Sequence, residues 1–322
     1  MSTEFANAVA AVRAMESTLL TQSDMERMAA AENTAAIAEI LTSCGRTVPR
    51  DKDELLRAMD EELEAVWEFL SDYAPENQEL EILVYRNNFH NLKAALKALI
   101  MDTDAQRLFL RPTSLSLNEL PGIVAAKHYD MLPVYMQETA MEAYDILTRT
   151  LDGQLADAVL DTAALQAMQT AAEQHKSEFM QKYAQLITVC ADMKTAYRCS
   201  MMQKSENFLD TAICGSRELD KTSLVRAAAR GTDALFTYLG GTPYSEAAEA
   251  LTISPARFEK WCDDAVISLA EEAKLQSFGI EPLAAYYLAK ETEVKNLRIL
   301  LVCKSCGAVQ ETITERMRKL YV

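Results

Sequence analysis

Apolar residues recur at intervals of three and four along most of the chain, the spacing that places them on one face of an α-helix. The runs 92–99 and 294–301 show this spacing clearly. The best candidate for a strand is the β-branched run 186–189, and it lies inside a longer helical pattern. The pattern therefore predicts an all-α protein.

Two short polar stretches, 111–114 and 215–218, interrupt the helical patterns most strongly. They divide the chain into three segments of similar length, each long enough to form a domain with its own core. The sequence thus predicts three helical repeats, 1–113, 114–216 and 217–322.

A polar helical pattern occurs once in each segment, which indicates repeats of one structural unit. The stretch 88–93 aligns with 192–197 and with 293–298. Each copy opens on a polar acceptor, continues with an apolar residue and carries a small polar residue at its fourth position. The candidate positions for structure or for an interface are Asn88, Asn91 and Lys93, then Asp192 and Thr195, then Glu293, Asn296 and Arg298.

A second similarity links the two outer segments. The run 24–30 resembles the run 223–229. The distance from this run to the polar pattern is greater in the last segment, so the alignment requires a length difference between the two landmarks.

The asparagines of the first polar pattern need an explanation, because asparagine is a poor helix former in mid-helix. A buried amide must be hydrogen-bonded. We therefore expect Asn88 and Asn91 to fix their helix to a neighbour within the same repeat. Exposure at an interface with a partner is the alternative.

Charge is strongly negative and unevenly distributed. Acidic residues outnumber basic ones by 48 to 32, giving a formal net charge of −16, which disfavours nucleic acid and anionic lipid as partners. The stretch 51–81 is acidic and the stretch 295–319 is basic. Such runs are often solvated helix faces, and the functional alternative is the docking of charged partners. In the acidic stretch, the candidates for contact with a partner are Glu61, Glu62 and Glu64.

Motifs of common catalytic and cofactor sites are missing from the sequence, which has no P-loop and no glycine-rich dinucleotide turn. Its seven cysteines are scattered, which argues against a disulfide framework and favours a reducing compartment. Cys303 and Cys306 form the single CxxC pair and lack a second pair of zinc ligands. We therefore expect no cofactor and no metal, and interpret these two thiols as incidental.

The hydropathy of the chain predicts a protein without a membrane span. No stretch approaches the roughly 18 consecutive apolar residues that indicate a transmembrane helix. The first residues also lack the charged-then-apolar order of a secretory signal. We therefore expect the protein in the cytoplasm.

Several of these stretches together resemble the C subunit of prokaryotic A/V-type rotary ATPases, the counterpart of the d subunit of eukaryotic V-ATPases. The resemblance extends along the whole chain. The run 12–20 is similar to the opening helix of the family, and 86–93 is similar to its most recognisable segment. The runs 281–283, 289–298 and 315–322 are typical of its C-terminal part.

This resemblance implies three similar helical bundles around a pseudo-threefold axis, shaped like a funnel. In the family, the funnel lies on the cytoplasmic face of the membrane proteolipid ring and receives the central stalk, which is made of the D and F subunits. The resemblance implies a non-catalytic rotor subunit that transmits torque for ATP-coupled transport of protons or sodium ions. It implies neither a nucleic-acid partner nor a small-molecule substrate.

The chain departs from the family at a few positions, and two other interpretations stay open. Thr195 stands where the family often has asparagine, and Cys303 and Cys306 lie where it usually has glycine and polar residues. One alternative is a free-standing helical-repeat scaffold or regulatory protein, which would bind no rotary ATPase subunit. The other is a thiol enzyme, which a Cys303→Ser substitution would inactivate.

Overall fold

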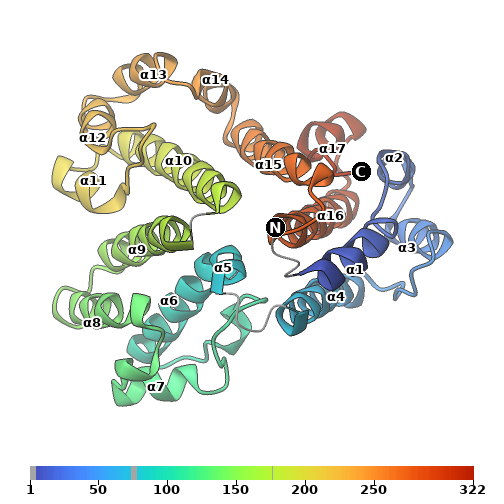
Figure 1. Ribbon diagram of the computed structural model, residues 1–322. Coiled ribbons are helices and arrows are strands. Elements are labelled where there is room, and N and C mark those ends of the chain that lie inside the picture. The colour runs from blue at the N-terminus through green and yellow to red at the C-terminus, as the bar shows by residue number, and fades with distance from the viewer. Residues whose placement is uncertain (1–4, 74–77, 176) are drawn as a thin grey trace. The chain divides into compact units, whose positions relative to one another are not determined.

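Helices account for the regular structure of the protein. The computed structural model describes residues 5–73, 78–175 and 177–322, and within these ranges it contains α-helices and short 3-10 helices but no strand (Figure 1). The all-α prediction is therefore confirmed. The run 186–189, the best candidate for a strand, lies inside helix α10 (Glu178–Met201).

The chain folds into two compact units. Unit 1 combines residues 1–77 with residues 253–322, so it draws on both ends of the chain, and unit 2 consists of residues 78–252. The division into three repeats groups the chain by similarity of sequence instead of by contact, and it stays a prediction.

Unit 1 is built around the long helix α16. Its helices are α1 (Ala6–Glu16), α2 (Gln22–Ala30), α3 (Thr34–Ser43), α4 (Lys52–Tyr73), α15 (Pro255–Glu272), the 3-10 helix η4 (Ala273–Leu275), α16 (Glu281–Ser305) and α17 (Gln310–Arg316). Helix α16 packs against α1, α3, α4, α15 and α17. Its buried residues therefore lie on all sides, whereas a surface helix carries a single apolar stripe.

Unit 2 is organised around α9 and α10. Its helices are α5 (Gln78–Glu81), η1 (Ile82–Val84), α6 (Tyr85–Met101), η2 (Gln106–Leu108), α7 (Leu120–Ala126), η3 (Tyr129–Met131), α8 (Val134–Arg149), α9 (Gly153–His175), α10, α11 (Glu206–Ala212), α12 (Lys221–Ala229), α13 (Thr232–Gly240) and α14 (Ser245–Ile253). Helix α9 packs against α6, α8, α10 and α11. One apolar cluster joins α6 to α9 and includes Phe89, Leu92, Val124, Met136 and Leu160.

The second similarity between the outer segments has a structural counterpart in α2 and α12. Each helix has nine residues and begins directly after a capping side chain. Thr21 accepts a hydrogen bond from the backbone N–H of Asp24, and Asp220 accepts one from that of Ser223. Such caps supply acceptors for N–H groups that a helix cannot satisfy itself. The repeat alignment is consistent with this correspondence.

The helices also indicate where the length difference lies. Asp24 and the end of α4 at Tyr73 are as far apart in sequence as Ser223 and the end of α15 at Glu272. The length difference between the two outer segments therefore lies between α4 and the polar pattern of α6 in the first segment, and between α15 and the polar pattern of α16 in the last. In the first segment this interval includes residues 74–77, which lie outside the described residues.

None of the helices in the described part of the chain is both long enough and apolar enough to cross a membrane.

Candidate functional site

Asn88 on α6 is completely buried, and its amide makes four hydrogen bonds. Its oxygen accepts from the hydroxyl of Thr113 at 2.5 Å and from the backbone N–H of Ser114 at 3.2 Å. Its nitrogen donates to the hydroxyls of Ser114 at 2.8 Å and Tyr135 at 2.9 Å. These bonds use the full capacity of the side chain. Asn88 thus holds the segment that follows 3-10 helix η2.

Asn91 and Asn296 make the same pair of contacts in different units. The Asn91 amide donates to the carbonyl of Leu110 at 2.9 Å and accepts from its N–H at 2.7 Å. Asn296 binds both backbone groups of Arg318 in the same way, at 3.0 and 2.8 Å. Each side-chain amide thus binds the N–H and the C=O of one residue, as a neighbouring strand would do in a sheet. Thr195 is half-buried, and no hydrogen bond of its side chain is found among the described residues.

Asp192 on α10 is a buried carboxylate held by backbone groups. Its two oxygens accept from the N–H of Cys214 at 2.9 Å and the N–H of Gly215 at 2.7 Å. Burial raises its pKa to about 6, although the two N–H groups and the charge of Lys221 oppose the shift. Gly215 has φ +80°, and a Cβ there would come within 2.6 Å of Cβ of Lys221, so this turn requires glycine.

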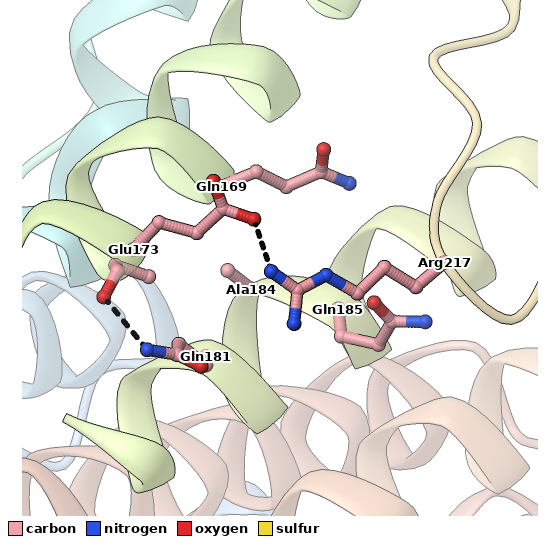
Figure 2. A pocket seen from close by; sticks show the side chains of 7 residues that line it. Gln169, Glu173, Gln181, Ala184, Gln185 and Arg217 are labelled. Carbon is pink, nitrogen blue, oxygen red and sulfur yellow. Dashed lines mark hydrogen bonds and ion pairs between the residues drawn. The ribbon is translucent and has the colours of Figure 1, made fainter. Parts of the chain in front are cut away.

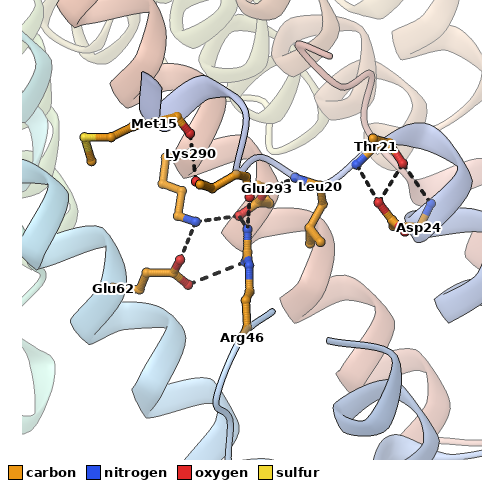
Figure 3. A network of polar contacts seen from close by, with 9 residues as sticks. Met15, Leu20, Thr21, Asp24, Arg46, Glu62, Lys290 and Glu293 are labelled. Carbon is orange, nitrogen blue, oxygen red and sulfur yellow. Dashed lines mark hydrogen bonds and ion pairs between the residues drawn. The ribbon is translucent and has the colours of Figure 1, made fainter. Parts of the chain in front are cut away.

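Glu293 on α16 is the centre of a buried polar cluster in unit 1, drawn in Figure 3. One carboxylate oxygen accepts the backbone N–H of Leu20 at 2.6 Å. The other accepts from the guanidinium of Arg46 and from Nζ of Lys290, each at 2.7 Å. Glu62 on α4 completes the cluster, with its oxygens 2.5 Å from Lys290 Nζ and 3.5 Å from Arg46 Nη1.

The cluster balances two cations with two carboxylates. The side chains of Lys290 and Glu293 are each 2% exposed, that of Arg46 is 11% exposed and that of Glu62 is 34% exposed. Buried charges are tolerated when they are paired and hydrogen-bonded. The cluster therefore joins the last long helix of the chain to α4 and to both ends of the segment that contains α2 and α3.

Lys93 and Arg298, the basic candidates of the polar pattern, differ in exposure: the side chain of Lys93 is 18% exposed and that of Arg298 is 52% exposed. Lys93 pairs with Asp161 of α9 at 2.6 Å, and the side chain of Asp161 is 64% exposed. Arg298 pairs with Asp60 of α4, and both of these side chains are more than half exposed. The Arg298–Asp60 pair is exposed, so it contributes little to stability and its side chains are accessible to a partner.

The three acidic candidates on α4 lie in different environments. Glu61 is exposed, Glu62 belongs to the buried cluster, and Glu64 is half-buried. Of these, Glu61 is the residue whose charge is most accessible to a partner.

A small polar pocket in unit 2 is shown in Figure 2. Its volume is about 50 Å³, and it is lined by Gln169, Ala172, Glu173, Gln181, Ala184, Gln185 and Arg217. Glu173 and Arg217 form an ion pair across it at 2.8 Å. A space of this size suits a few water molecules and is too small for a nucleotide.

The described residues contain no group of His, Cys, Asp and Glu side chains that could hold a metal ion. Of the CxxC pair, Cys303 is buried and Cys306 is exposed at the end of α16. The two thiols therefore differ in access to solvent.

Sequence reasoning missed Arg46 and Lys290, which complete the cluster. Lys290 carried a signal, because it directly follows the apolar run 283–289, and a lysine buried in such surroundings is almost always paired. Arg46 lies in the turn after α3, and nothing in the local sequence points to a partner more than two hundred residues away.

The model of the family described as "ATP synthase (C/AC39) subunit" matches residues 8–316. Among curated proteins, the C subunit of the V-type sodium ATPase of Enterococcus hirae is 28% identical over 323 residues, which cover 96% of this chain and 97% of that protein. The matched range of the family model includes Asn88, Asp192 and Glu293.

Proposed function

Since this chain belongs to the ATP synthase (C/AC39) subunit family, we propose that it is a non-catalytic rotor subunit of a V/A-type rotary ATPase. In this role it connects the central stalk, formed by the D and F subunits, to the proteolipid ring of the membrane sector. It transmits torque between the ATP-driven stalk and the ion-carrying ring. The coupling ion, proton or sodium, is a property of the ring under this proposal.

The observation that carries the proposal is the end-to-end match to the C subunit of a V-type ATPase, which covers 96% of this chain and 97% of the relative. A match of this extent includes residues of both compact units, so the resemblance is not confined to a shared local motif. The expected place of the protein is the cytoplasmic face of the membrane, where it is bound through other subunits.

The helical architecture supports a mechanical role. A torque adaptor must resist deformation, and tightly packed helical cores have low compressibility. In unit 1, residues from both ends of the chain pack around α16, and the Glu293 cluster adds directional contacts between them. Charged surface pairs such as Arg298 and Asp60 leave side chains for electrostatic matching with partners.

Isolation from native membranes tests the proposal. Tagged protein is captured from membranes in mild detergent, and the co-purifying proteins are identified by mass spectrometry. We expect the D and F stalk subunits, the proteolipid and the ATP-hydrolysing A and B subunits. If none is recovered from membranes shown to contain the ATPase, the proposal is wrong and the scaffold or regulatory alternative is favoured.

The second part of the test locates the contacts. Purified D–F stalk and purified membrane sector are each titrated with the protein, and binding to both is expected. Binding to only one of them would contradict the role of a connector, although membership of the family would stand.

A further inference from the structure

We infer that residues 20–46, which contain α2 and α3, form a latched hairpin that opens as one body, and that Glu293 is the latch. We call this segment the α2–α3 hairpin. This inference rests on the contacts within unit 1 and is independent of the proposed function.

The α2–α3 hairpin is tied together internally. The Thr21 hydroxyl and the Asp24 carboxylate cap the start of α2 reciprocally. The Cys44 thiol lies 3.5 Å from the same carboxylate, so the end of the hairpin returns to its beginning. Arg27 of α2 also reaches the Ser43 hydroxyl of α3 at 3.4 Å. These contacts allow the two helices to move together.

The polar contacts between the hairpin and the remainder of unit 1 lie mainly at its two stems. Within the part of the chain that the structure describes, its polar contacts outside the hairpin come from Leu20, from Arg46 and from the exposed pair of Glu39 with Arg50. Its other contacts, with α4, α16 and α17, involve buried apolar side chains such as Met28 and Ile37. Apolar contacts are non-directional, so the stems determine the orientation of the hairpin.

Both stems meet one side chain, as Figure 3 shows. Glu293 accepts the backbone N–H of Leu20 with one oxygen and the guanidinium of Arg46 with the other. Arg46 also donates to the carbonyl of Thr18 at 3.2 Å, which brings the stems together. A single carboxylate thus closes the hairpin at both ends.

The latch is connected to α4 as well as to α16. Lys290 bridges Glu293 and Glu62, and Glu62 faces Arg46. Loss of the Glu293 charge would leave Lys290 and Arg46 with one carboxylate between them. Because both stems lose their charged partner at once, we expect such a loss to free the hairpin to a greater extent than it destabilises the core around α16.

Hydrogen–deuterium exchange with a Glu293→Gln variant tests this inference. The substitution keeps an acceptor and nearly the same side-chain volume but removes the charge from both stems. We expect amides of residues 22–43 to exchange about tenfold faster or more, as a strong charged hydrogen bond is lost, and amides of α4, α15 and α16 to change much less. The matched control, Asp60→Asn, breaks the exposed pair with Arg298 in the same unit and leaves exchange in 22–43 unchanged.

A uniform acceleration across unit 1 would mean that Glu293 acts only on global stability, and no acceleration in 22–43 would mean that it is not the latch. Either result overturns the inference. If the variant does not fold, the unaltered protein still decides the question. Its α2 and α3 amides should exchange through one common opening that is faster than the opening of α4 and α16, and separate rates for α2 and α3 would contradict a hairpin that moves as one body.

Discussion

Asp192 in unit 2 and Glu293 in unit 1 are buried carboxylates at corresponding positions of the repeat alignment, yet their charges are balanced in different ways. Asp192 accepts hydrogen bonds from two backbone N–H groups. Glu293 accepts one backbone N–H and is also bound by Lys290 and Arg46. Neutral donors offset only part of the desolvation of a charge, and the raised pKa of Asp192 is the result.

Asn88 at the third corresponding position carries no charge. Its amide holds Thr113 and Ser114 with every donor and acceptor in use. One task, holding the backbone of a connecting segment, is thus performed by an amide, a lone carboxylate and a paired carboxylate. The three sites should therefore respond differently to substitution, and the site of Asp192 should respond to pH.

The largest effect is expected from Lys290→Met, which removes a cation from the Glu293 cluster. Removing one partner of a buried ion pair typically lowers the free energy of unfolding by about 3–5 kcal/mol, because the remaining charge stays buried without its partner. The measurement is urea unfolding followed by tryptophan fluorescence, since both tryptophans, Trp67 and Trp261, lie in unit 1.

The matched control for this prediction is Arg298→Met, which breaks the exposed pair with Asp60. Here the expected loss is about 1 kcal/mol or less. Equal losses in the two variants would show that burial does not distinguish the pairs.

The next effect concerns pH and Asp192. Its pKa in the folded protein is about 6, above the value near 3.9 of an unfolded chain, so the folded state binds the proton more tightly. The resulting stabilisation is complete below about pH 4 and is lost as pH rises through 6. Over that range it amounts to about 3 kcal/mol.

A carboxyl-carbon NMR titration measures this pKa directly, and unfolding by urea between pH 4 and 7 measures its effect on stability. In an Asp192→Asn variant, this pH-dependent part of the stability of unit 2 should disappear. An unaltered pH profile in the variant, or a pKa below 4 for Asp192, would contradict the difference drawn between the two carboxylates.

A smaller effect is expected from Asn296→Ala, which removes both hydrogen bonds to Arg318. At about 1 kcal/mol for each bond, the loss is about 2 kcal/mol. The segment after α17 should then become accessible to carboxypeptidase, with release of the last residues followed by mass spectrometry. Asn91→Ala is the counterpart in unit 2, and it should lose a similar amount of stability without affecting the C-terminal segment. Release of the C-terminal segment in both variants would show that its attachment does not depend specifically on Asn296.

The smallest effect on stability is expected from Glu61→Gln, within about 0.5 kcal/mol, because Glu61 is exposed. Its expected effect is on binding, since loss of a surface charge slows association with a basic partner. The measurement is the salt dependence of association with the D–F stalk and with the membrane sector. Unchanged binding to both would remove α4 from the candidate interfaces. Glu62 is unsuitable for this test because it supports the buried cluster.

The sequence was most informative where local pattern determines structure. The all-α architecture followed from apolar spacing, and the polar positions of α6, α10 and α16 were visible because asparagine and aspartate are unfavourable in apolar helices. Their partners were not visible. Leu110, Gly215 and Arg318 lie outside the helices and are bound through backbone groups, which carry no signal in the side-chain sequence.

The grouping of Arg46, Glu62, Lys290 and Glu293 was beyond sequence reasoning for a second reason. Glu62 occurs in an acidic run whose residues look equivalent in sequence, and only the rotation of α4 decides that it turns inward while Glu61 faces solvent. The union of both chain ends in unit 1 was likewise invisible, because it depends on contacts between residues far apart in the chain.

This union of the two ends has a consequence for biosynthesis. All residues of unit 2 are synthesised before the C-terminal part of unit 1. Until α16 is made, the N-terminal helices therefore lack the helix that packs against α3 and α4, and Trp67 lacks its ring contact with Tyr287. Domains generally fold as units during synthesis, so unit 2 should fold first. A chain arrested before residue 281 should be recognised by chaperones or proteases at its N-terminal helices.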